Sequence, residues 1–138
     1  PSCRANRTAT QSIADITLTA VSFTAADSWD TDSFHSTVSN QSRLTVPSGL
    51  GGKYLIVASA NWANNSTGWR DLSIRANGST NLAAARVGTG TANPYAISTI
   101  TTVEQLAAGT YIEVTIWQNP GAALDITAAN VTILQVSL

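Results

Sequence analysis

A short polar stretch, WDTDSFHSTVSNQSR at residues 29–43, holds the residue types most able to do chemistry. Asp30, Asp32 and His35, the only histidine of the chain, lie within six positions of one another. Carboxylates beside an imidazole could hold a metal ion, supply the base and orienting acid of a catalytic triad, or order a loop.

A Ser-His-Asp triad can be drawn from Asp30 or Asp32 with His35, because serines and threonines surround the histidine. The spacing selects no particular nucleophile among them. The sequence also lacks the G-x-S-x-G, H-E-x-x-H, phosphate-loop and dinucleotide-binding motifs. We therefore expect a protein that is not an enzyme, with no catalytic residue and no cofactor.

Calcium is the lesser alternative for this stretch. Asp30 and Asp32 offer the hard oxygen ligands that calcium prefers, but no third or fourth ligand is evident nearby. His35 is a poor calcium ligand, and zinc would need more nitrogen or sulfur donors. A structural role is favoured, in which Asp and Ser side chains bond to main-chain amides and His35 pairs with a carboxylate, a carbonyl or the next subunit.

Composition bounds the class of protein. The chain has 138 residues, 11% of them charged, and a formal net charge of -1. This balance argues against a nucleic-acid partner, and no apolar run approaches the roughly 20 residues that span a membrane. The N-terminus lacks the basic and then apolar build of a signal peptide. Cys3 is the single cysteine, which excludes an intrachain disulfide, and we expect it to be an ordinary thiol or, less readily, a contact between chains.

The elements that must position these residues are strands. Apolar residues alternate with polar ones in short segments near 10 residues apart, Gly, Pro and Asn separate the segments, and no helical period occurs. The segments predicted as strands are 12–23 (one or two strands), 43–46, 53–63, 69–76, 80–87, 95–106, 109–118 and 129–138. Residues 1–11 are predicted as a polar N-terminal arm and residues 12–138 as a single domain.

Three of these segments carry further information. Residues 53–63, KYLIVASANWA, are apolar at both alternating sets of positions and predict a strand buried on both faces. Asn77-Gly78 predicts a tight hairpin turn. In 109–118, Ile112, Val114 and Ile116 are predicted to point inward. The pattern as a whole predicts an all-β, two-sheet antiparallel sandwich, and a jelly roll is preferred because the Cys-Trp-Cys core of immunoglobulin domains is missing.

Particular stretches resemble the C1q/TNF-like superfamily. They are GKYLIVASANW after SRLTVP, RDLSIRANG, LAAGTYIEVTIWQN and the closing ANVTILQVSL. Gly52, Tyr54, Ile56 and Ala58 match one family pattern. A second pattern, L-x-x-G-D-x-V-x-L/V, is matched from Leu106 to Val114 except that Thr110 stands where the family usually has Asp. The resemblance implies a homotrimer of ten-stranded jelly rolls.

A narrower resemblance concerns C1q-like domains of tailed-bacteriophage virion proteins. It rests on the 29–45 stretch WDTDSFHSTVSNQSRLT followed by an N-x-T-G-x-R turn and I-x-x-N-G. It implies a structural protein on the virion surface, with the major capsid protein or other virion proteins as partners. We expect a capsid decoration or cement protein, because the sequence has no heptads, collagen repeats or shaft repeats. The alternatives are the receptor-binding head of a tail or head fibre and, less favoured, a carbohydrate-binding module.

Outward-facing residues suggest where partners bind. On 109–118, Tyr111, Glu113, Thr115 and Trp117 are left on the outer face, and large aromatics there are typical of buried interfaces. We predict a trimer interface that includes Tyr111, Thr115, Trp117 and His35. Four other aromatics lie in or beside loops and could contact a host-surface glycan or receptor: Trp29, Trp62, Trp69 and Tyr95.

Overall fold

The computed structural model of the chain describes residues 1–91 and 95–137. In these residues the chain forms eleven strands and no helix, so no helix that could cross a membrane is found there. The strands are β1 Ser2–Arg7, β2 Gln11–Ile13, β3 Thr19–Ala20, β4 Ala25–Asp30, β5 Arg43–Thr45, β6 Gly52–Trp62, β7 Trp69–Ala76, β8 Thr80–Gly88, β9 Ile97–Leu106, β10 Tyr111–Gln118 and β11 Leu124–Ser137.

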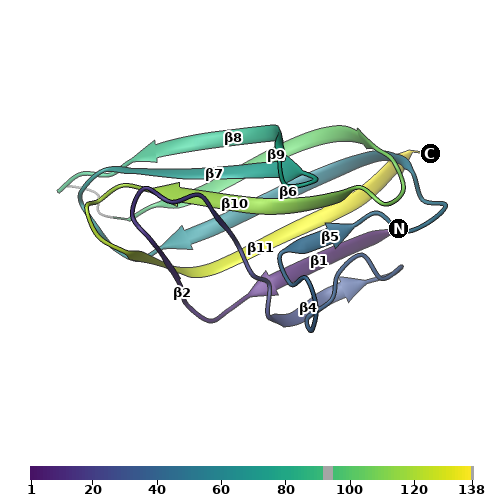
Figure 1. Ribbon diagram of the computed structural model, residues 1–138, viewed down its shortest axis with the longest axis horizontal. Helices are drawn as coiled ribbons and strands as arrows, with labels where there is room; N and C mark the ends of the chain where they lie inside the picture. The colour runs from purple at the N-terminus through teal and green to yellow at the C-terminus, as the bar shows by residue number, and fades with distance from the viewer. Residues whose placement is uncertain (92–94, 138) are drawn as a thin grey trace.

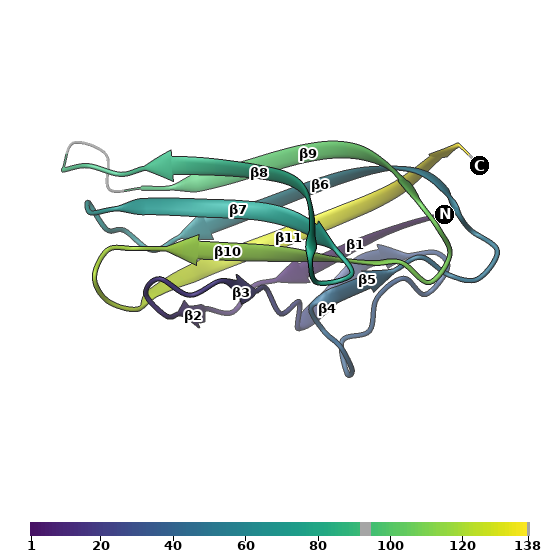
Figure 2. The same cartoon turned by 45° about the horizontal axis from the view of Figure 1, so that its top comes forward.

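The strands form two antiparallel sheets that pack face to face (Figures 1 and 2). One sheet has the order β4-β1-β11-β6-β9, with β2 paired to β11. The other has the order β3-β10-β7-β8, with β5 paired to β10. The all-β antiparallel sandwich predicted from the sequence is confirmed.

The core lies between the two sheets and follows the alternation of the strands. Ile112, Val114 and Ile116 of β10 are at most 1% exposed, as predicted from their spacing. They face the alternate residues of β6, from Tyr54 to Trp62, across the sandwich. Burial of large aliphatic side chains contributes roughly 1.5–3 kcal/mol each, which makes this layer the main source of stability.

The hairpin at Asn77-Gly78 is confirmed. Asn77, Gly78 and Ser79 join β7 to β8, and the amide of Ser79 donates to the carbonyl oxygen of Ala76 at 3.2 Å. The two central residues of this turn, Asn77 and Gly78, have positive φ angles of 50° and 74°, which Asn and Gly adopt at least cost. This hairpin sets the register of β7 against β8.

The prediction of a polar N-terminal arm at residues 1–11 is wrong. Residues 2–7 are strand β1, which lies between β11 and β4, and Cys3 and Ala5 are fully buried. The alternation of SCRANR was hidden because its inward residues are small and its outward residues are polar. Strand β1 forms because it pairs antiparallel with β11, in register from Ser2 with Leu134 to Arg7 with Ala129.

Residues 12–30 also differ from prediction. The Ser12–Phe23 segment forms two short strands, β2 and β3, as predicted, but the expected inward residue Ile16 lies between them, 68% exposed and with a φ of 53°. The connection expected after it contains strand β4, which pairs with β1 at the sheet edge. Within the closing segment, β11 begins earlier than predicted, at Leu124.

Strand β6 has only one buried face in a single chain. Its inward residues are buried, whereas on the outward face Lys53 is exposed and Leu55 and Val57 are half-buried, because no further layer covers them. The prediction of burial on both faces is therefore wrong for one subunit. Parts of two other predictions, Ala92 to Pro94 of the turn GTGTANP and Leu138 of the last strand, lie outside the described residues.

Candidate functional site

Asp30 orders the loop that follows β4. Its Oδ1 accepts hydrogen bonds from the amides of Phe34 at 2.9 Å and Asp32 at 3.4 Å, and its Oδ2 accepts one from the amide of His35 at 2.9 Å. A carboxylate that accepts several main-chain amides holds a loop much as a turn does. The loop therefore returns toward the sheet, and Phe34 enters the core.

His35 is held between two acceptors. Its Nδ1 lies 2.9 Å and 3.1 Å from the two carboxylate oxygens of Asp27, and its Nε2 lies 3.1 Å from the carbonyl oxygen of Gln41. The imidazole has no exposed surface. Both ring nitrogens therefore have a hydrogen-bond partner within the same chain. His35 thus ties β4 to the far end of the loop.

This geometry does not form a catalytic triad. Asp27 orients the imidazole as a triad acid would, but Nε2 faces a carbonyl instead of a hydroxyl. A hollow of about 200 Å³ beside the loop is lined by Ser33, Ser36 and Ser39 among others. The buried His35 ring is not open to a substrate in that hollow, and Ser36 Oγ accepts the amides of Val38 and Ser39.

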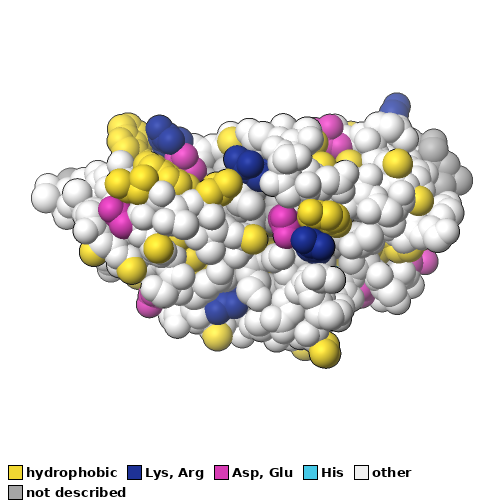
Figure 3. Space-filling model, viewed as in Figure 1, with side chains coloured by type: hydrophobic (Ala, Val, Ile, Leu, Met, Phe, Trp, Pro, Cys, Tyr) yellow, Lys and Arg dark blue, Asp and Glu magenta, His cyan; other side chains and the backbone are white. Residues whose placement is uncertain are grey.

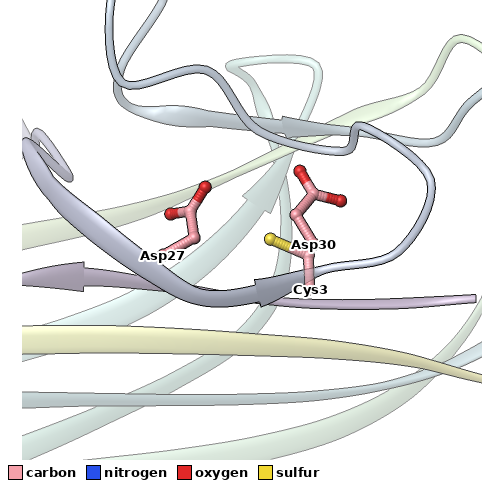
Figure 4. A group of neighbouring side chains, drawn as sticks. All are labelled: Cys3, Asp27 and Asp30. Atoms are coloured by element: carbon pink, nitrogen blue, oxygen red, sulfur yellow. The ribbon is translucent and has the colours of Figure 1, made fainter.

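The donor group that comes together is Cys3, Asp27 and Asp30, whose ligand atoms all lie within 4.8 Å of one another. Figure 4 shows the Cys3 sulfur lying between the two aspartates. The carboxylates already accept hydrogen bonds from main-chain amides and from His35, and a cation would have to displace these donors. Asp32 lies outside this group and accepts a 2.5 Å hydrogen bond from Thr31, and the lesser alternative of calcium at Asp30 and Asp32 stays a prediction.

The Cys3 thiol is expected to be unreactive in this environment. Burial raises its pKa far above the ordinary value, and the nearby charges of Asp30 and Asp27 raise it further. A thiolate is the reactive form of cysteine, so the neutral thiol is protected. Cys3 acts as a small core residue of β1 rather than as a contact between chains.

The predicted interface residues fall in two places. Tyr111, Thr115 and Trp117 lie on the outer face of β10, whereas the His35 side chain is covered by its own chain and offers no surface to a partner. Thr115 is 6% exposed and shares a 2.7 Å hydrogen bond with Ser73 of β7. The interface role of the three β10 residues stays a prediction. The predicted interface role of His35 is wrong, because its side chain is buried within its own chain.

The two β10 aromatics are covered by arginines of the same chain. The Arg43 guanidinium carbon lies 4.1 Å from the Tyr111 ring centre, and that of Arg86 lies 5.5 Å from the Trp117 ring centre. Cation–π contacts of this kind reduce the bare apolar surface that the rings present. Neither ring is therefore an uncovered hydrophobic anchor.

The four loop aromatics differ in exposure. Trp29, Trp69 and Tyr95 are 44%, 49% and 65% exposed. Trp62 is only 4% exposed and packs in the core beneath the guanidinium of Arg70, so its prediction as a ligand contact is wrong. The strand alternation already placed Trp62 on the inward face of β6, and that signal was the better guide.

Arg70 and Asp27 are important residues that the sequence patterns missed. Arg70 is fully buried and donates to the carbonyl oxygens of Thr67, Trp69 and Asn65, which fixes the loop before β7. Burial lowers the pKa of Arg70. Asp27 lies in a strand and contacts His35 eight residues later. Charged residues at inward strand positions were the only available signal for Arg70.

The two outer faces of the sandwich carry different chemistry. On the six-stranded sheet, Leu134, Leu55 and Val103 lie side by side on three neighbouring strands, and Thr132, Val57 and Thr101 form the next row. Leu134 and Val103 are 42% and 57% exposed. The five-stranded sheet instead gathers aromatic, basic and acidic side chains toward the ends of β8 and β10 (Figure 3).

The fold is that of a C1q/TNF-like jelly roll. The chain is similar to the globular domain of zebrafish complement 1qA protein, with a TM-score of 0.71, 15% identity and coverage of 99% of this chain and 97% of that one. It is also similar to PRD1 vertex protein P5 (0.69, 16% identity, 99% and 73% covered) and to murine APRIL (0.65, 15% identity, 97% and 100% covered). No protein-family model and no curated protein sequence matches the chain.

Proposed function

We propose that this chain is a non-enzymatic structural protein of a phage virion, a homotrimeric C1q/TNF-like jelly roll that decorates or cements the capsid surface. The single observation that carries the trimer is the apolar row Leu134–Leu55–Val103 on the outer face of the six-stranded sheet. The similarity to a viral vertex protein, PRD1 P5, supports the virion setting. The major capsid protein is the expected partner.

A second copy of this chain is the best occupant of the six-stranded face. The face carries aliphatic and hydroxyl side chains and few charges, and closed symmetry buries such a surface without leaving sheet edges open. It would also cover the outward residues of β6, whose apolar sequence predicts two buried faces. The outer face of β10, with Tyr111, Thr115 and Trp117, is the competing interface.

The rival function is the receptor-binding head of a tail or head fibre, and a free carbohydrate-binding module is the least favoured. Exposed Trp69 and Tyr95 favour the fibre head, because aromatic rings at a surface can contact a glycan or receptor. Cryo-electron microscopy of particles that carry the protein separates the two. Density at capsid three-fold positions supports decoration, and density at a tail or fibre tip supports the receptor-binding head.

Light scattering on the purified chain tests the trimer itself. A homotrimer gives three times the chain mass of 14.4 kDa at micromolar concentration. A monodisperse monomer over the whole concentration range would overturn the trimer. The proposal of a virion location would then have to stand on the microscopy alone.

A further inference from the structure

A shallow hollow of about 390 Å³ lies on the outer face of the five-stranded sheet. Its lining residues come from three paired strands, β10, β7 and β8, and from Leu18 just before β3. This volume is at the low end of the roughly 300–1,000 Å³ typical of small-molecule sites. The hollow lies on the face opposite the proposed trimer interface.

Small side chains make the floor of the hollow. Ser73 and Ala84 line it as cross-strand neighbours, and Thr115 is the neighbour of Ser73 on β10 in the same row. The hydroxyls of Thr115 and Ser73 bond to each other at 2.7 Å and both residues are nearly buried, so the floor has little unsatisfied polarity. Larger side chains in the rows on either side form the walls, so the outer surface of the sheet is hollowed at this row.

One wall carries an aromatic ring and an ion pair, whose two charges offset each other. Trp117, Asp71 and Arg86 are cross-strand neighbours, and both oxygens of Asp71 accept 2.6 Å hydrogen bonds from Arg86. The Arg86 guanidinium lies near the rings of Trp117 and Trp69, at 5.5 Å and 6.0 Å from their centres. Trp69 can lie across the neighbouring strand because Gly88 opposite it has no side chain, and a Cβ there would come within 2.9 Å of the ring. The planar groups of this wall are thus held in place.

The other wall holds Arg75, for which the described residues show no ion pair although Glu113 is its cross-strand neighbour. Arg75 lies between Glu113 of β10 and Asn81 of β8. Glu113 accepts hydrogen bonds from Ser42 and Arg43, and the described residues place no carboxylate in ion-pair contact with Arg75. The Nε of Arg75 is buried and has no hydrogen-bond partner. With Arg86 paired to Asp71, the lining has one net positive charge, and it lies at Arg75.

We propose that this hollow binds a saccharide that carries a carboxylate. The carboxylate pairs with the guanidinium of Arg75, whose fork geometry suits two parallel hydrogen bonds. A sugar ring lies over the small floor against Trp117, and Asn81 and Asp71 bond to its hydroxyls. Arg75 and Asp71 are four residues apart on β7, about 13 Å along the strand, which leaves room for two linked rings.

The chemistry of the lining separates this ligand from others. A phosphate or nucleic acid would draw on several cations or on a cradle of amides, and this site has a single unpaired guanidinium. A purely apolar ligand would leave the Arg75 charge without a partner. An aromatic face beside fixed carboxylate and amide groups suits a ring that is apolar on its faces and hydroxylated at its edge.

Titrations followed by NMR test the proposal. The probes are 3′-sialyllactose and digalacturonate as two sources of the carboxylated sugar, and lactose is the neutral match. We expect one or both acidic sugars to shift the indole N–H signal of Trp117, assigned by its loss in Trp117→Phe, and lactose to bind at least about tenfold more weakly. Binding of only one acidic sugar identifies the source and supports the site.

Matched variants locate the binding. Arg75→Gln should weaken the acidic sugar at least about tenfold while the thermal unfolding curve stays unchanged. Trp29→Phe, on β4 in the other sheet, should leave the affinity unchanged. Equal binding of lactose, equal binding by Arg75→Gln, or no binding of either acidic sugar up to about 10 mM would overturn the proposal.

A short oligoglutamate peptide tests charge alone. It should bind at least about tenfold more weakly than the acidic sugar, because it offers carboxylates without a ring for Trp117. Equal binding of the peptide would overturn the saccharide as the ligand. None of these outcomes bears on whether the chain forms a trimer, since the hollow lies on the face away from the proposed interface.

Discussion

The two outer faces of the sandwich differ in how their large outward side chains are covered. Both have large outward side chains at central strand positions. On the five-stranded sheet Trp117 and Tyr111 are covered by Arg86 and Arg43 of the same chain. On the six-stranded sheet, Leu134 and Val103 lie partly bare. An aromatic covered by its own chain is compatible with a free surface, whereas an aliphatic row gains stability only when another layer covers it.

The largest expected effect comes from a charge on the aliphatic row. Leu134→Glu places three like charges in the buried part of the proposed trimer and should raise its dissociation constant at least about 100-fold, because like-charge contacts cost several kcal/mol. Light scattering at micromolar concentration should give the monomer mass.

Trp117→Ala is the matched change on the opposite face and should leave the trimer intact. If Trp117→Ala dissociates the trimer and Leu134→Glu does not, the roles of the two faces are reversed, and the interface predicted from β10 is the correct one.

A smaller effect is expected at the loop beside the six-stranded sheet. Asp30→Ala removes the acceptor of three main-chain amides and should lower the free energy of unfolding by about 2–3 kcal/mol. Asp32→Ala, whose carboxylate accepts only a local hydroxyl, should change it by less than about 0.5 kcal/mol. Urea unfolding at fixed protein concentration measures both.

The same pair separates a structural loop from a calcium site. Calorimetric titration of the wild-type protein with Ca²⁺ should give no heat of binding. Saturable binding that both Asp30→Ala and Asp32→Ala remove would show that the carboxylates act as ligands after all.

The Cys3 thiol should make stability depend weakly on alkaline pH. Its pKa is raised by burial and by Asp30 and Asp27, so the folded chain keeps a proton that the unfolded chain releases near pH 9. The stabilising contribution is full below that pH and is lost as pH rises above it. Comparing the wild type with Cys3→Ala by thermal unfolding between pH 7 and 10 should show a steeper loss in the wild type.

The smallest expected effect is at Arg86. Arg86→Ala removes an exposed ion pair with Asp71, and such pairs contribute little because water screens them. The unfolding curve should be unchanged within error, while the fluorescence of Trp117 and Trp69 should respond to loss of the neighbouring guanidinium. A large loss of stability would mean that the charged face also supports the fold.

The sequence predicted those parts of the fold whose pattern is complete within one strand. The alternation of Ile112, Val114 and Ile116 and the Asn77-Gly78 turn each depend on neighbouring residues only. Strand β1 was missed because Cys3 and Ala5 become core residues only when β11, more than 120 residues later, pairs with them.

The sites were less accessible for the same reason. The sequence could indicate that His35 pairs with a nearby carboxylate. It could not identify Asp27 as the partner, because Asp27 lies in a strand that the sequence pattern did not reveal. The hollow depends on three strands in register, where Thr115, Ser73 and Ala84 form one row. No single segment contains that row, so no local pattern could predict it.

The central place of β11 has a consequence for how the chain reaches its native state. This strand joins β1 on one side to β6 on the other, so the six-stranded sheet is split into the pairs β4-β1 and β6-β9 until Leu124–Ser137 is available. During synthesis, both halves would present open strand edges to other nascent chains. Folding should therefore be slow and completed only after residue 137 leaves the ribosome, and aggregation during expression should fall when synthesis is slowed.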